Sequence, residues 1–384
     1  MNGLVTLLLA LLAGCATVTP MAPMPPVTDL LHDEAFAPSA VPIDSSAALA
    51  LSDPMRDYLA SHFGSHSRSL DRRRDLVNAL NRGDLKLEYD SLMTRTAAQA
   101  FQARSGNCLA LVMMTAALAK ELGLVVHYQE VLGEQTWDRT DDLHIAIGHV
   151  NLVLDERRES VGSYAITAGP MVVDFLPPRD ARRLVTRPIA ERTVVAMYLN
   201  NRAVESLTQG QVDNAYWWAR ESVHTDPEML GAYLTLGVVY RARHLSQAAD
   251  QVLQRIIARE PDHVLALSNR ALVLRDLGRT AEADALVQRV AALDPDPPFS
   301  YFNAGIEAYR AGRIEQARRL FAKEVARAPY HHEFEFWLGL SHLALGDAEQ
   351  ARVHLTRAMQ ASTTRKDHDL YAAKLDRLKA TRAQ

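Results

Sequence analysis

A long apolar stretch lies in the middle of the chain. From Leu109 the sequence reads LALVMMTAALAKELG and ends at Gly123. A run of helical length that is apolar on every side predicts a helix buried in a core. Asn107 is a favourable N-cap and Gly123 a favourable residue just past the end, so Cys108 falls in the first helical turn.

Several shorter segments after this helix read as strands. They are Leu124 to Val131, Ile145 to Leu154, Tyr164 to Thr167 and Met171 to Phe175, with Asp155 to Arg158 as a turn. Their order and short connections predict an antiparallel meander. One buried helix followed by antiparallel strands indicates an α+β fold.

The second half of the chain repeats every 34 residues. Four columns share this period: proline (Pro227, Pro261, Pro295, Pro329), a small residue (Ala203, Gly237, Ala271, Gly305, Gly339), alanine (Ala215, Ala249, Ala283, Ala317, Ala351) and a turn residue (Gly210, His244, Gly278, Gly312, Gly346). Small residues let paired helices approach closely, and proline separates successive units. The period resembles that of tetratricopeptide repeats.

This resemblance implies an all-α solenoid of five repeats over Ala196 to Ser362, with a capping helix within residues 363–384. The concave face of such an array usually holds an extended peptide or a partner protein. A protein or peptide partner is therefore expected.

Composition excludes several functional classes. The 384 residues are 48% hydrophobic and 23% charged, with a formal net charge of -4. This balance argues against general disorder and supplies no global basic field for nucleic acid. Two cysteines, Cys15 and Cys108, cannot form a disulfide framework or a paired-cysteine zinc site. We expect no metal site and no cofactor.

The N-terminus resembles a bacterial lipoprotein signal. Leu4 to Leu12 is an apolar run of signal-peptide length, and Leu12-Ala13-Gly14-Cys15 resembles a lipobox. This implies a signal peptide over residues 1–14, lipidation of Cys15, and membrane attachment through lipid alone. Ala16 resembles the outer-membrane sorting pattern, which places the protein in the cell envelope, facing the periplasm. The alternative is an ordinary signal peptide with an incidental cysteine.

Six prolines follow within residues 20–42, so residues 15–48 are interpreted as a semi-rigid tether. A poorly ordered N-terminus without a specific role is the alternative.

Cys108 is the residue with the clearest chemical potential. A thiol at a helix N-terminus feels the positive end of the helix dipole, which favours the thiolate. An unpaired thiol in an oxidising compartment is also a liability that a structural role does not explain. The alternative is an inert buried thiol.

The order of residues around Cys108 resembles the transglutaminase-like superfamily. The matching motifs are Gly106-Asn107-Cys108, Gly148-His149-Val150-Asn151 and Val172-Val173-Asp174-Phe175, with Arg95 to Ala98 and Phe101 upstream. The resemblance covers Asp53 to Arg187 and implies a transglutaminase-like domain over residues 49–190. The family's aromatic residue after the histidine is absent, which leaves the substrate class open.

By this resemblance Cys108, His149 and Asp174 form a catalytic triad. His149 would take the thiol proton, Asp174 would orient the imidazole, and the thiolate would attack an amide carbonyl to form a thioester. The Cys108 N–H is the expected oxyanion donor, with Gln99 or Gln102 as a second candidate. His144 competes with His149, but strand alternation places these two histidines on opposite faces, and the following strand favours His149.

Two charged clusters receive structural interpretations. His331-His332-Glu333 is read as a solvated helix start rather than a metal site, because adjacent helical residues point in different directions. Arg72-Arg73-Arg74, between Asp71 and Asp75, is read as a charged helix face.

Two functions remain open. The first is a cell-envelope cysteine acyltransferase or peptidase whose repeat array recruits a protein or peptide substrate. The second is a lipid-anchored, non-catalytic interaction scaffold with a remnant cysteine domain.

Overall fold

The computed structural model describes residues 23–63, 71–82, 85, 87–90, 93–140, 143–155, 169–175, 185–296, 299–329, 331–362 and 365–382. Cys15, the apolar run before it and the strand expected at Tyr164 to Thr167 lie outside these ranges. Within them, every helix is too short or too polar to cross a membrane.

The helix α4 (Cys108–Glu121) is the buried helix that the sequence predicts. Asn107 caps it, because its Oδ1 accepts a hydrogen bond from the N–H of Ala110 at 2.9 Å. Gly123 ends it in the left-handed region at φ 79°, where a side chain would be strained. All side chains from Leu109 to Ala119 are buried, so α4 is the centre of the α+β region.

Short elements precede α4 in the α+β region. They are α1 (Asp53–Phe63), α2 (Arg72–Arg82), α3 (Ala97–Ala103) and the parallel pair β1 (Glu88–Tyr89) and β2 (Ser105–Gly106). The prediction of a fully charged face on α2 is wrong at Arg73, which is 2% exposed. Its guanidinium lies 3.0 Å from Asp71 and donates to the Gly169 carbonyl, so these partners offset the cost of burying the charge.

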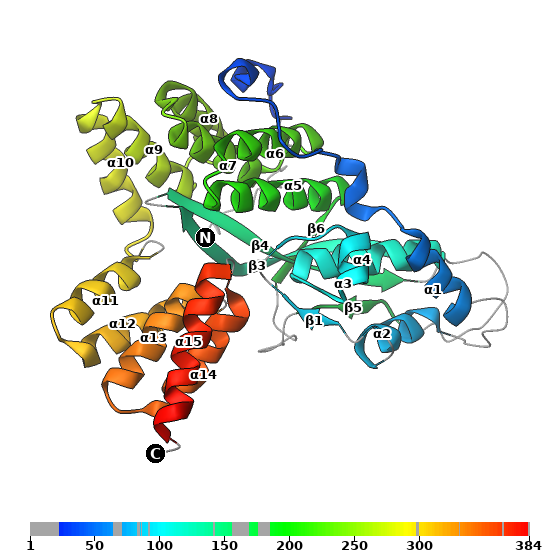
Figure 1. Ribbon diagram of the computed structural model, residues 1–384. Coiled ribbons are helices and arrows are strands. Elements are labelled where there is room, and N and C mark those ends of the chain that lie inside the picture. Colours follow the sequence, from blue (N-terminus) through cyan, green and yellow to red (C-terminus); the bar gives the residue numbers. More distant parts are fainter. Residues whose placement is uncertain are drawn as a thin grey trace, which may run out of the picture.

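The sheet is antiparallel, but its order differs from a simple meander. The strands β3 (Val125–Thr140), β4 (Leu143–Asp155), β5 (Met171–Val173) and β6 (Val185–Ile189) lie in the order β5-β4-β3-β6. Sequence analysis did not predict β6. The β3–β4 hairpin is much longer than the other strands and extends beyond them towards the helical repeats (Figure 1).

Five helix pairs and a final helix form the repeat array. They are α5 (Glu191–Thr208) and α6 (Val212–Thr225), α7 (Leu230–Ala242) and α8 (Ser246–Arg259), α9 (Val264–Asp276) and α10 (Thr280–Leu293), α11 (Ser300–Arg310) and α12 (Ile314–Arg327), α13 (His332–Ala344) and α14 (Ala348–Ala361), and α15 (Arg365–Arg382). The array thus begins before Ala196, at Glu191. Each expected turn residue has positive φ, including the non-glycine His244 at 63°.

We call the side formed by the first helix of each pair the inner face, and the side formed by the second helices the outer face. The strand β4 contacts α7 and α9, while β3 and α4 contact α5. The hairpin and the α+β region therefore cover the inner face of repeats 1 to 3.

The expectation of a projecting tether is wrong for the described part of that segment. We call residues 23–49 the strap: its first part runs over the outer face of repeats 1 and 2, and its end, Ser45–Leu49, contacts α3, α4 and α5 (Figure 1). Phe36 stacks on Tyr216 with ring centroids 3.9 Å apart, and Asp33 accepts a hydrogen bond from Arg220. The apolar side chains between the prolines make this segment pack: Val27, Leu30 and Phe36 are buried.

The array divides between repeats 3 and 4, although the 34-residue period continues. In repeats 1, 2, 4 and 5 the second helix packs on the helix that follows it: α6 on α7, α8 on α9, α12 on α13 and α14 on α15. Among the described residues, α10 and α11 show no comparable packing. Repeats 1 to 3 share one core with the α+β region, and repeats 4 and 5 have separate cores.

Candidate functional site

The strand β4 presents His149 to an aspartate on its neighbour. His149 Nε2 lies 3.0 Å from both Oδ1 and Oδ2 of Asp174, which follows β5 directly. His149 is 5% exposed, so this charge-assisted contact is shielded from water. The structure therefore brings together two of the residues that the sequence placed in one site.

Cys108 approaches the same imidazole from the start of α4. It is a free, half-buried cysteine whose charge acts on His149. His149 Nδ1 is buried and makes no hydrogen bond to a described residue. Catalytic hydrogen bonds are often loose in unliganded sites. His149 thus lies between Cys108 and Asp174.

The electrostatics of His149 favour its charged form. Burial lowers the pKa of the imidazole, but the hydrogen bonds to Asp174 and the charges of Asp174 and Cys108 outweigh burial and raise the pKa to about 10. The arrangement therefore places a positively charged ring near the Cys108 side chain.

Asn151 belongs to this cluster and was not predicted. Its Nδ2 donates to Asp174 Oδ2 at 3.1 Å, and its side chain is buried. It lies two residues after His149, so strand alternation puts both side chains on one face. That spacing is the signal from which Asn151 could have been found.

A register shift in the hairpin lies directly beside His149. Val131 pairs with His149, but the next pair is Thr136 with Ile147. Extra residues on one strand bend it and redirect neighbouring side chains, and such irregularities are frequent next to functional sites. His144 pairs with Arg139 on the outer part of the same hairpin, and its side chain is not among those described.

The other candidates have different surroundings. The amide oxygen of Gln99 accepts a hydrogen bond from the Thr96 N–H in a capping box, and Gln102 is exposed. His331 does precede a helix, but the expectation that it is solvated is wrong: it is buried and stacks on Phe334. No group of three or more His, Cys, Asp or Glu side chains in the described ranges could hold a metal ion.

A second candidate site is the inner face of repeats 4 and 5. On α11, Asn303, Glu307 and Arg310 are exposed and form one stripe, because they are spaced by four and three residues. On α13 the position equivalent to Glu307 is Ser341, which is buried. In repeat 3 the equivalent of Asn303 is Asn269, which is 1% exposed on the helix that β4 contacts. The inner face is therefore covered at repeat 3 and accessible at repeat 4.

Comparisons with known proteins agree on the repeats. The tetratricopeptide repeat family matches residues 234–298 and 302–364. No curated protein matches the chain in sequence.

Solved structures with a similar fold include tetratricopeptide-repeat proteins. A thermophilic tetratricopeptide-repeat protein from Thermus thermophilus is 16% identical, covering 47% of this chain and 98% of its own, with a TM-score of 0.31. MamA from Desulfovibrio magneticus is 19% identical (45% and 96% covered, TM-score 0.26). YrrB, described as a repeat protein with an unusual peptide-binding site, is 19% identical (47% and 92%, TM-score 0.25). The family match, together with the observed helix pairs, shows that the C-terminal region contains tetratricopeptide repeats.

Proposed function

We propose that this chain is a protein-interaction scaffold whose tetratricopeptide array binds an extended segment of a partner protein on the inner face of repeats 4 and 5. The observation that supports the proposal is the accessible stripe on α11, on the face that β4 covers in repeat 3. An extended peptide bound there would place its polar backbone near Asn303.

Site-specific photo-cross-linking tests the scaffold proposal. A photoreactive amino acid replaces Glu307 on the inner face in one variant and Glu349 on the outer helix α14 in a matched control; both positions are exposed. We expect discrete protein adducts from position 307 that position 349 does not form. The same adducts from both positions, or none from position 307, would refute the proposal.

We further propose that residues 49–190 form a transglutaminase-like domain in which Cys108 acts on an amide bond through a thioester. The placement of His149 between Asp174 and Cys108 supports this second function. His149 would hold the thiol proton and later deliver it to the leaving amine, and Asp174 would orient the ring. Water or an amine would then resolve the thioester.

Alkylation of Cys108 tests this chemistry without a known substrate. We expect iodoacetamide to modify Cys108 near neutral pH at least about tenfold faster than it modifies a cysteine peptide, because a nearby imidazolium favours thiolate. The variant His149→Gln should lose this advantage. Reactivity equal to that of the peptide, unchanged by His149→Gln, would contradict the proposal.

We also propose that Cys15 is lipidated and anchors the protein in the cell envelope. The lipobox-like sequence before Cys15 supports this proposal. Mass spectrometry of the mature N-terminus tests this. A diacylglyceryl-modified Cys15 that is lost in Cys15→Ser is expected, and an unmodified cysteine would contradict it.

A further inference from the structure

A chain of hydrogen bonds connects the start of α4 to the first helix of the repeat array. Asn107, the residue before Cys108, caps α4 with its Oδ1 and donates from Nδ2 to Thr94 Oγ1 at 2.8 Å. The orientation of this amide, and with it the first turn of α4, therefore depends on Thr94.

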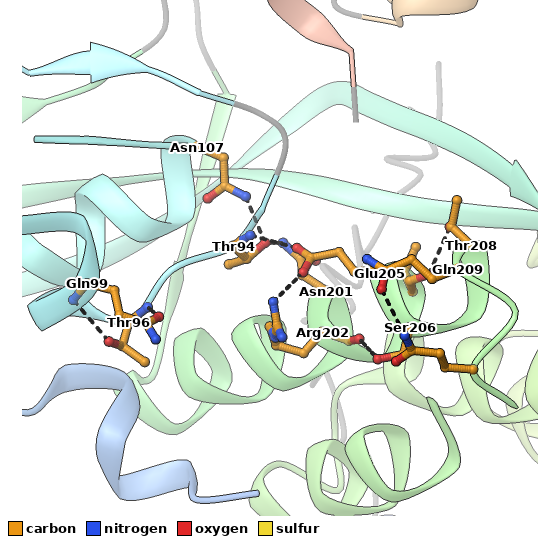
Figure 2. Close-up of polar contacts among 12 residues, drawn as sticks. Thr94, Thr96, Gln99, Asn107, Asn201, Arg202, Glu205, Ser206, Thr208 and Gln209 are labelled. Atoms are coloured by element: carbon orange, nitrogen blue, oxygen red, sulfur yellow. Dashed lines mark hydrogen bonds and ion pairs between the residues drawn. The ribbon is translucent and has the colours of Figure 1, made fainter. Parts of the chain in front are cut away.

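Thr94 is 2% exposed and is held in turn by α5 (Figure 2). Its N–H donates to Glu205 Oε1 at 2.7 Å. Its hydroxyl oxygen, which accepts from Asn107, also accepts a hydrogen bond from Asn201 Nδ2 at 3.3 Å. Two contacts with α5 therefore hold Thr94 in place.

Glu205 is itself paired within the array. Its Oε2 lies 2.7 Å from the guanidinium of Arg202, and its side chain is 19% exposed. Burial raises the pKa of Glu205, and the charge of Arg202 and the contact with Thr94 oppose that rise. The pair is therefore a partly shielded charge whose other oxygen, Oε1, accepts from the Thr94 N–H.

We propose that Glu205 of α5 is a positioning residue for Cys108, acting through Thr94 and Asn107. The first repeat then forms part of the cysteine site and is more than a platform beside it. This inference rests on the proposed chemistry of Cys108. It predicts that Cys108 reactivity changes when α5 loses Glu205, although Glu205 does not touch the thiol in the proposed mechanism.

The test measures the rate constant for alkylation of Cys108 by iodoacetamide, and its dependence on pH, in the full chain. We expect Thr94→Val and Glu205→Ala to lower the rate constant at neutral pH about tenfold, the factor that corresponds to one buried hydrogen bond, and to move the profile to higher pH. Glu205→Gln should retain most of the rate, because its amide oxygen can still accept from Thr94.

Thr115→Val is the matched control. Thr115 is a buried threonine on α4 whose hydroxyl has no hydrogen-bond partner among the described residues, so its loss should leave the profile unchanged. Thermal unfolding is measured in parallel, because a purely structural role would lower Tm without moving the pH profile of the folded protein.

Two results would overturn the inference. An activated wild-type thiol whose rate and profile are the same in Glu205→Ala would reject the positioning role alone. A wild-type thiol that reacts like a free peptide would reject the role together with the proposed chemistry.

Discussion

Repeats 1 to 3 and repeats 4 and 5 are built from the same 34-residue unit but have different surroundings. In the described chain, the strap and the hairpin contact the array at α5 to α9, and repeats 1 to 3 share a core with the α+β region. Repeats 4 and 5 have their own cores and an accessible inner face. The same unit thus has two settings: the first group packs against the cysteine region, and the second keeps an accessible inner face.

The largest expected effect comes from a matched pair of core truncations. Leu253 in repeat 2 and Leu355 in repeat 5 occupy equivalent positions, and both are buried against a helix glycine, Gly237 or Gly339. Each change to alanine should cost about 2–5 kcal/mol locally. Hydrogen exchange should show the Leu253→Ala effect reaching the α+β region and the Leu355→Ala effect confined to repeats 4 and 5. Equal spread of both effects would mean that the array does not divide.

The next largest effect is expected on the attachment of the strap to the repeats. Phe36→Ala removes a buried ring that stacks on Tyr216, and we expect a loss of about 3 kcal/mol in the free energy of strap release. Limited proteolysis within residues 23–49 measures that release. Glu34→Ala, which truncates a side chain that is 78% exposed, is the control. Equal cleavage of the two variants would show that the strap is not held by its apolar side chains.

The hairpin that covers repeats 2 and 3 carries a titrating group. The pKa of His149 is raised from 6.5 to about 10. The contribution of His149 to the free energy of unfolding is therefore complete below about pH 6.5, falls as pH rises and is lost above about pH 10. The unfolding free energy of wild type should therefore exceed that of His149→Gln by about 1.5–3 kcal/mol near pH 6, the range for a hydrogen bond to a charged group. Denaturant unfolding from pH 6 to 10.5 measures the difference, and a difference that grows with pH would contradict this account.

The smallest effect concerns close helix approach in repeat 4. A Cβ on Gly305 would lie 2.6 Å from the Phe321 ring, whereas a Cβ on Gly231 of α7 would meet only the end of Met229 at 3.5 Å. Gly305→Ala should lose about 1 kcal/mol, since overpacking outweighs the gain in helix propensity, and Gly231→Ala should gain a few tenths. Thermal unfolding of both variants checks the sign, and stabilisation by Gly305→Ala would show that the Phe321 ring can move aside.

Local signals made part of this structure predictable. The N-cap at Asn107 and the glycine at Gly123 set the ends of α4, and the period of 34 located the turns of the array. Both depend on residues close in sequence, where capping and backbone conformation act directly.

The remaining features depend on contacts between distant segments. The prolines of the strap indicated an extended chain, but only the contacts with α6, α7 and α8 explain why Leu30 and Phe36 are buried. The 34-residue period did not reveal the division of the array, because the proline spacing continues through Pro295, between repeats 3 and 4. At the position where Leu253 and Leu355 are buried, Val287 of repeat 3 is 43% exposed. Glu205 and Thr94 became a candidate network only once α5 lay beside the start of α4.

The most direct test of the central claim is the affinity of the array for the partner that cross-links at position 307. Isothermal titration would compare wild type with Glu307→Arg on the inner face, Glu349→Arg on the outer helix α14, and Cys108→Ala. The account predicts that Glu307→Arg weakens binding at least about tenfold, the effect of an interface residue worth more than 1.4 kcal/mol, while the other two variants bind as wild type does. Loss of binding in Cys108→Ala, with Glu307→Arg unaffected, would contradict it.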